Sequence, residues 1–147
     1  MQRTIRLKLT PSPAQAVSLA ETSRRFTGAF NPFVRLGWAA QVGNATKLHY
    51  LAYYPVRTSL LTLNSNLINT ARAKAAEALR SAFALQEQGC KVTMPQSDAC
   101  PPRYNVHTYR VERNSAAKYH ARAGRPRAGG LPVNQPIVSV PVPRHQE

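Results

Sequence analysis

The stretch LNSNLINTARAKAAEALRSAF, residues 63–83, decides how the middle of this chain folds. Its polar start offers Asn64 and Asn66 as helix caps, and Gly89 follows where a helix would end. Apolar residues recur at helical spacing between them and form one stripe, made of Leu67, Ala71, Ala75, Ala78, Ala82 and Leu85. The sequence therefore predicts a long amphipathic helix between Asn64 and Gly89.

A second long helix is predicted upstream of this stretch. Ser12 can cap it, Pro13 suits its first position, and Gln15 completes a capping box with Ser12. Large apolar residues then recur at near-helical spacing. Pro32 interrupts this pattern and removes a helical hydrogen bond, so we expect a kink or break near Phe30–Asn31.

Shorter elements are predicted around these two helices. Thr46 can cap a short helix over Lys47–Tyr54, which would end before Pro55. The segments Arg3–Leu9 and Tyr104–Val111 alternate apolar and polar residues, which predicts two strands.

The composition changes after Val111. Residues 112–147 are rich in proline and glycine and have few large apolar residues, so we expect a disordered tail. Its arginine, proline, alanine and glycine content is also typical of a shifted reading frame in a GC-rich gene, which is a hypothesis for its origin.

The charge of the chain favours an anionic partner. Twenty Lys and Arg stand against six Asp and Glu, giving a formal net charge of +14. Such a charge attracts nucleic acid at least non-specifically. The sequence has neither an apolar run long enough to span a bilayer nor a signal peptide, so we expect a cytoplasmic or nucleoid-associated protein without a membrane partner.

Cysteine and histidine give no metal-binding pattern. Cys90 and Cys100 stand alone, without a CxxC motif, and the four histidines are scattered. We therefore expect reduced thiols, no metal site and no cofactor.

Four segments together resemble the N-terminal part of the TnpB (OrfB) family of transposon-associated, RNA-guided nucleases, often called transposases. The segments are IRLKLTPSPAQ, FTGAFNPFVRLGW, LNSNLINTARAKAAEALRSAF and KVTMPQSDACPPRYNVHTYRV. Each is weak alone, and their order carries the resemblance, which covers residues 1 to about 111.

The resemblance implies an α+β fold, in which a helical recognition bundle is inserted into a partial wedge-type β-barrel. Residues 1–10 would form the first barrel strand and residues 11–90 the bundle. Residues 91–111 would form a link and the second barrel strand, and residues 112–147 the disordered tail.

The family cleaves DNA with a RuvC-like two-metal site made of Asp, Glu and Asp, and it also has a zinc ribbon. Here Asp98 is the only aspartate, so this carboxylate set cannot be assembled, and the zinc-ribbon cysteines are missing. We therefore expect a truncated, non-enzymatic part that binds guide RNA and a duplex DNA motif.

Two alternatives remain open at this point. The chain could be a stand-alone DNA- or RNA-binding regulator without nuclease activity. It could also act with a separately encoded RuvC-like half as its partner.

The residues expected to contact nucleic acid come from both predicted strands and from the helices. They are Arg3, Arg6, Lys8, Lys47, Asn64, Ser65, Asn66, Asn69, Thr70, Arg72, Lys74, Arg80, Arg103, Tyr104 and Asn105. Lys and Arg would bind phosphates, while Asn side chains could read base edges.

Structural roles compete with these assignments. Asn64 or Asn66 would cap the helix, which does not explain Asn69. Tyr104 could stack on a base or pack the barrel. Arg72, Lys74 and Arg80 could also form an ordinary solvated helix face. The tyrosines of residues 50–54 could stack on RNA, but we expect them to pack inward.

Overall fold

A computed structural model describes residues 11–105, 107–108, 110–113, 119–122 and 137–140. Contacts divide the chain into two units, residues 21–105 and residues 1–20 with 106–147. Each unit is described by itself below.

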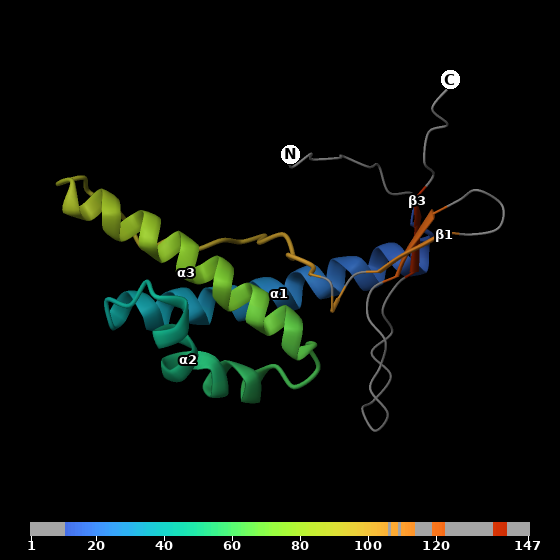
Figure 1. The fold of residues 1–147 in the computed structure, drawn as a ribbon, viewed down its shortest axis with the longest axis horizontal. Helices are drawn as coiled ribbons and strands as arrows, with labels where there is room; N and C mark the ends of the chain where they lie inside the picture. The colour runs from blue at the N-terminus through green and yellow to red at the C-terminus, as the bar shows by residue number, and fades with distance from the viewer. Residues whose placement is uncertain (1–10, 106, 109, 114–118, 123–136, 141–147) are drawn as a thin grey trace, which may run out of the picture. The chain divides into compact units, whose positions relative to one another are not determined.

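Three helices carry the described part of residues 11–105: α1 (Pro13–Ala39), α2 (Ala45–Ser59) and α3 (Ser65–Glu87), as Figure 1 shows. A segment without helix or strand follows α3. We call residues 89–105 the strap, because they run back beside α1 and α3. All three helices lie in the range where a helical bundle is expected from the sequence.

The start of α1 confirms the predicted capping box. The backbone N–H of Ser12 donates to Gln15 Oε1 at 2.9 Å, and the N–H of Gln15 donates to Ser12 Oγ at 3.3 Å. Of the kink or break predicted near Phe30–Asn31, the break is wrong, because α1 continues through Pro32 to Ala39.

Burial explains why proline does not end α1. Pro32 leaves the carbonyl of Gly28 without its helical donor. The neighbouring residues Phe30, Phe33 and Val34 are buried on both sides of the proline, which favours an unbroken helix.

Helix α2 also continues past a proline. Asn44 caps it, since its side chain accepts from the N–H groups of Thr46 and Lys47 at 2.9 and 3.1 Å. The prediction of a Thr46 cap and an end before Pro55 is therefore wrong. The helix reaches Ser59 because Val56, one residue after Pro55, is buried in the core.

Helix α3 matches the sequence prediction closely. Asn64 is its N-cap and accepts from the N–H of Asn66 at 2.8 Å. Gly89 follows the helix end with a φ of +80°, a conformation that favours glycine. Of the expected apolar stripe, Leu85 is 45% exposed, so burial ends before the last turn.

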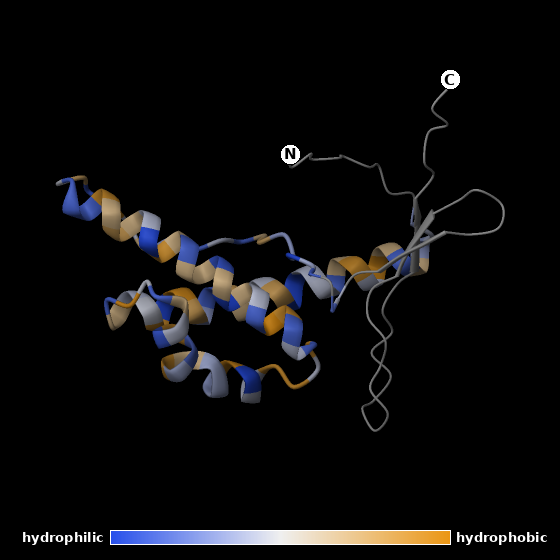
Figure 2. Ribbon diagram, in the orientation of Figure 1, coloured by the Kyte–Doolittle hydropathy of each residue, from blue (hydrophilic) through white to orange (hydrophobic). Residues whose placement is uncertain are grey.

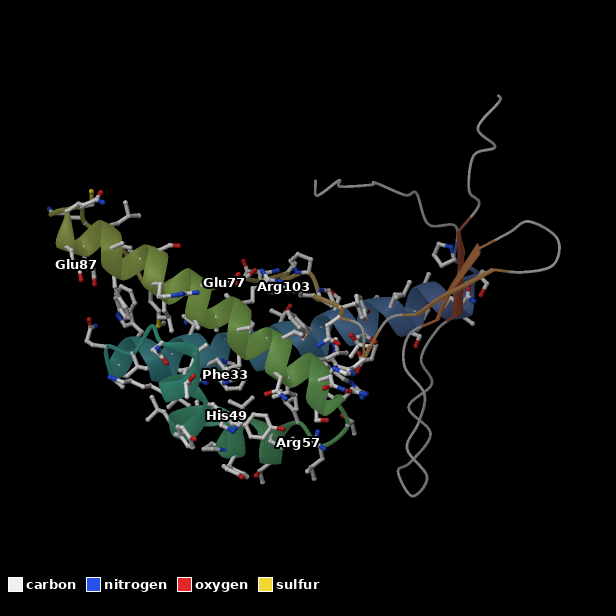
Figure 3. All side chains as sticks on the ribbon, in the orientation of Figure 1. Phe33, His49, Arg57, Glu77, Glu87 and Arg103 are labelled. Atoms are coloured by element: carbon white, nitrogen blue, oxygen red, sulfur yellow. The ribbon has the colours of Figure 1, made fainter. Side chains whose placement is uncertain are left out.

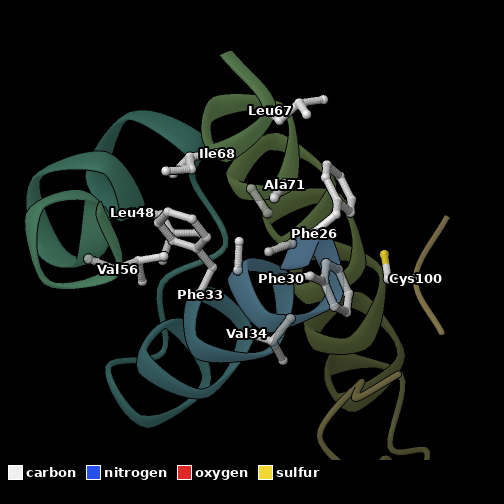
Figure 4. Close-up of a cluster of buried hydrophobic side chains, with 14 of the residues drawn as sticks. Phe26, Phe30, Phe33, Val34, Leu48, Val56, Leu67, Ile68, Ala71 and Cys100 are labelled. Carbon is white, nitrogen blue, oxygen red and sulfur yellow. The ribbon is translucent and has the colours of Figure 1, made fainter. Parts of the chain in front are cut away.

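The core of residues 21–105 lies between the three helices and the strap. Figure 2 shows apolar residues on the facing sides of the helices and polar residues outside. In Figure 4, Phe33 points toward α2 beside Leu48, while Phe26 and Phe30 lie toward the strap residue Cys100. Small residues of α3, such as Ala71, let the helices approach closely.

Side-chain hydrogen bonds attach the strap to α1. The Asn31 side chain donates to the carbonyl of Ser97 at 2.9 Å and accepts from its N–H at 3.1 Å. One turn earlier, Thr27 Oγ1 accepts from the N–H of Cys100 at 2.9 Å. Because these groups are partly or fully buried, the bonds fix the strap on the helices.

The other unit contains a small antiparallel sheet. Its described strands are β1 (Arg110–Arg113), β2 (Tyr119–Arg122) and β3 (Ile137–Val140), in the order β1-β2-β3. Arg110 pairs with Arg122 across β1 and β2, and Tyr119 pairs with Val140 across β2 and β3.

The wedge-barrel fold expected from the resemblance is wrong. The described part of the chain is mainly helical, and its strands form a short open sheet with no barrel. The second barrel strand was expected at Tyr104–Val111, but β1 begins only at Arg110. The first barrel strand, residues 1–10, lies outside the described residues.

Two short strands, β2 and β3, lie within residues 112–147, where the sequence predicts a disordered tail. Short β-rich segments such as Ile137–Val140 carry enough β-branched residues to pair, which the overall composition of this region concealed. Residues 114–118, 123–136 and 141–147 lie outside the described ones.

No helix in the described residues is long and apolar enough to cross a membrane.

Candidate nucleic-acid interface

Residues 21–105 carry a net positive charge. This unit has ten Lys and Arg against four Asp and Glu, and residues 22–76 contain no carboxylate at all. The helices therefore present cations along most of their length with few acidic neighbours.

Two of the four carboxylates in this unit, Glu21 and Glu77, form ion pairs. Glu21 accepts from Arg24 and Arg25 at 2.8 and 2.6 Å, and these hydrogen bonds lower its pKa to about 2. Glu77 accepts two bonds of 2.7 Å from Arg103 on the strap, which lowers the pKa of Glu77. Figure 3 shows Glu77 and Arg103 next to each other, away from the α2 residues that it labels.

Arg72 links α3 to the beginning of α2. Its Nη1 donates to the carbonyl of Ala45 at 2.7 Å, while its buried Nε finds no hydrogen-bond partner in the described residues. Burial lowers the pKa of Arg72, and the nearby Tyr53 has the opposite effect. Arg72 therefore has a partly structural role, because it connects α3 with the start of α2.

Arg80 and Lys47 lie near the same end of α2. The Arg80 side chain passes over Gly43, where an added Cβ would meet Arg80 Cγ at 2.9 Å. Lys47 is exposed in the first turn of α2, which contains no acidic residue. We call Lys47, Arg72 and Arg80 the basic face, because all three surround the start of α2.

The basic face coincides with the positive end of a helix dipole. The N-terminus of α2 adds a partial positive charge to the three side chains, which favours a bound anion. Asn69 precedes Arg72 by one turn of α3, so its half-buried side chain lies on the same side of the helix.

Lys74 lies on a different side of α3 from the basic face. Its Nζ donates to the carbonyl of Pro101 on the strap at 2.9 Å. The structure therefore separates Lys74 from Arg72 and Arg80, with which the sequence grouped it. A spacing of two residues turns Arg72 and Lys74 to different faces of the helix.

Two of the polar residues at the start of α3 have structural roles. Asn64 is the cap, and Thr70 is buried and donates to the carbonyl of Leu67 at 3.0 Å. Ser65 is exposed, and Asn66 is half-buried. Of this group, Ser65, Asn66 and Asn69 keep their side chains free of hydrogen bonds within the described residues.

The strap residues behave differently from the expected barrel strand. Tyr104 packs against the helical core, and burial raises its pKa, so its ring has a packing role. Arg103 is held by Glu77, and Asn105 is half-buried. Arg3, Arg6 and Lys8 lie outside the described residues.

The predicted burial of the aromatic residues of α2 is wrong for two of them. We expected its tyrosines to pack inward, but Tyr50 and Tyr54 are 79% and 70% exposed. His49 and Tyr53 are half-buried instead. The signal that could have found this is the helical spacing itself, since residues 50 and 54 share a face opposite the buried Leu48, Ala52 and Val56.

The Glu77–Arg103 pair gives a measurable pKa prediction. Replacing Arg103 by glutamine should raise the pKa of Glu77 toward its ordinary value of 4.5, because the main cause of the lowering is lost. A carboxyl-detected NMR titration measures this, with Glu21 as the internal control that should keep its pKa of about 2. An unchanged pKa at Glu77 would contradict the pairing.

The sign of the effect on stability follows from the direction of the shift. The pKa of Glu77 is lowered in the folded chain, so the pair stabilises the fold above pH 4.5. That contribution disappears as the pH falls through the lowered pKa. Both side chains are about half exposed, so solvent screening keeps it small.

Within the described residues, no group of three or more His, Cys, Asp and Glu lies close enough to hold a metal ion. No protein-family model matches this chain, and no curated protein matches it in sequence.

Proposed function

We propose that this chain binds nucleic acid, and that the basic face around the start of α2 contacts the phosphate backbone. One observation carries the proposal: residues 22–76 are free of carboxylates, while Lys47, Arg72 and Arg80 gather at one helix N-terminus. Cations and a helix dipole at one place suit a phosphate group.

The proposal assigns different tasks to the residues of this face. Lys47 and Arg80 are exposed and form no salt bridge in the described residues, although Glu77 lies near enough to Arg80 to interact electrostatically. Both side chains can therefore pair with a phosphate, which releases counterions from the nucleic acid. Arg72 positions α2 through the Ala45 carbonyl and adds its charge to the face. Asn69 lies beside them with an amide that suits the edge of an adenine.

The resemblance to TnpB-type proteins supplies the most specific form of the proposal. Guide RNA and a duplex DNA motif would then be the partners, and cleavage would belong to another polypeptide or another part. In this chain the single aspartate, Asp98, cannot form a two-metal carboxylate set, so we propose a binding role without catalysis.

Removing the two exposed cations together tests the basic face. In a Lys47→Gln/Arg80→Gln variant, duplex DNA should bind more weakly, and the slope of log affinity against log salt should become shallower by about two units. Fluorescence anisotropy at several salt concentrations measures both quantities. Circular dichroism shows whether each variant keeps its helices.

A matched variant distinguishes a loss of contacts at the basic face from a loss of overall positive charge. Arg35→Gln/Lys91→Gln also removes two exposed cations, but these lie on α1 and on the strap. We expect this variant to change the affinity by less than about twofold, because long-range attraction alone is screened at physiological salt. Equal losses in both double variants would refute a localised phosphate site.

A further inference from the structure

The outer side of α2 carries an aromatic surface that the phosphate contacts leave unexplained. Tyr50 and Tyr54 are 79% and 70% exposed. They are one helical turn apart and so lie on the same side of α2, and we call these two residues the aromatic face. Large exposed apolar side chains that share one side of a helix suit a binding surface.

The two tyrosine rings are supported from below. His49 stacks on Tyr53 with ring centroids 4.5 Å apart. Tyr50 meets the His49 ring edge-on at 5.7 Å, and Tyr54 meets Tyr53 edge-on at 5.6 Å. These contacts hold the exposed rings in place, so little side-chain entropy is lost when a ligand binds them.

The spacing of the rings suits a strand of nucleotides. Tyr50 and Tyr54 are one helical turn apart, which separates their Cα atoms by about 6 Å along the axis. Successive nucleotides of one strand are about 3.4 Å apart, so the two rings span about two nucleotide steps. Aromatic side chains stack on unpaired bases whatever the sequence.

Charge decides between nucleic acid and an apolar protein partner. Helix α2 contains no carboxylate, and Lys47 precedes Tyr50 by one turn. Arg57 donates to the Leu63 carbonyl at 2.7 Å and adds a second cation at the other end of the helix. Cations at both ends of an aromatic surface complement a chain that alternates bases with phosphates.

We infer that the aromatic face of α2 binds unpaired bases of a single-stranded nucleic acid by stacking on Tyr50 and Tyr54. This inference rests on the proposed function, since the basic face would bind the backbone of the same molecule. It adds a second contact of different chemistry, which distinguishes a single strand from a duplex whose bases are already stacked.

The full chain is tested by fluorescence anisotropy with a labelled oligouridylate of about 12 nucleotides, a length in the range of known single-strand sites. Tyr50→Ala and Tyr54→Ala should each weaken binding by about 5- to 150-fold, the loss expected per stacked base. Phe replacements should stay within about twofold of the wild type, because a phenyl ring stacks as well as a phenol.

Two controls identify stacking as the cause. Leu85→Ala removes an apolar side chain from α3 that is 45% exposed, and it should leave binding unchanged. An oligonucleotide of the same length with abasic sites should bind the wild type as weakly as the Ala variants bind the intact strand. Circular dichroism should show all variants folded, because neither tyrosine is buried.

The outcomes separate this inference from the proposed function. If the wild type binds neither the duplex nor the single strand, the proposed function fails. If the wild type binds the duplex but the Tyr→Ala variants bind the single strand as well as the wild type does, the inference alone is overturned. Loss of self-association in the Ala variants, without loss of RNA binding, would instead assign the face to a protein contact.

Discussion

Replacement of Phe33 by alanine is expected to lower the free energy of unfolding by about 3–5 kcal/mol. The Phe33 side chain is fully buried, and its ring lies beside Leu48 where α1 meets α2 (Figure 4). Alanine would remove the whole ring and leave a cavity that three packed helices cannot fill. This loss is a large fraction of the total stability of a small domain.

Chemical denaturation monitored by circular dichroism measures this loss. Phe33→Leu keeps more of the buried volume and should cost less than Phe33→Ala. Leu61→Ala removes a side chain that is 73% exposed and should change the stability by no more than about 0.5 kcal/mol. A similar result for Phe33→Ala and Leu61→Ala would show that Phe33 is not in the core.

The helix ends that the sequence predicted well are those with a local cause. The capping box of Ser12 and Gln15 and the cap of Asn64 depend on residues within three positions of each other. Gly89 ends α3 because it alone accepts a positive φ at that point. Such signals do not need the rest of the fold.

Burial by distant residues overruled the proline signals. Pro32 and Pro55 each remove one helical hydrogen bond, and the sequence therefore suggested a kink or break near Pro32 and a helix end before Pro55. In the structure, Phe30, Phe33 and Val34 are buried beside Pro32, and Val56 is buried beside Pro55, and this burial favours continued helices. No local pattern reveals this balance, since it depends on partners far along the chain.

The barrel was expected from the family resemblance. Its second strand does not form as predicted at Tyr104, because this residue packs against the helices. Tyr104 alternates with its neighbours as a strand residue would, yet its ring packs on the helical core. The strap is held there by Thr27 and Asn31 of α1, whose contacts with Cys100 and Ser97 connect residues far apart in sequence. Neither the composition nor the alternation of apolar and polar residues predicts such contacts.

The candidate site was predictable in composition but not in arrangement. The excess of Lys and Arg is visible in the sequence, whereas their hydrogen bonds are not. Arg72 donates to the Ala45 carbonyl and Lys74 to the Pro101 carbonyl, so these two expected phosphate ligands lie on two sides of α3.

Gly37→Ala is expected to lower the free energy of unfolding by about 1–3 kcal/mol, although alanine favours helices. Gly37 is buried in α1 against α3. A Cβ at this position would overlap Leu79 Cδ1 and meet the backbone oxygen of Val42 at 2.9 Å. The leucine can rotate, but the backbone oxygen cannot move alone, so α1 and the turn after it must separate.

Gly28→Ala in the same helix is the matched control, because a Cβ there meets nothing within 4 Å. This variant should gain about 0.4–1 kcal/mol through reduced entropy of the unfolded chain and better helix propensity. Thermal and chemical unfolding of both variants compare the same substitution in two environments. Stabilisation by both would mean that α1 and α3 are not packed as closely as described.

The same pair connects packing with the proposed binding site. Leu79 immediately precedes Arg80, and Gly43, in the turn after α1, lies under the Arg80 side chain. A displacement of this turn away from Gly37 therefore also moves the start of α2, with Lys47, relative to Arg80. At a temperature where both variants are folded, Gly37→Ala should weaken duplex binding and Gly28→Ala should leave it unchanged, because only the former changes the spacing of the basic face.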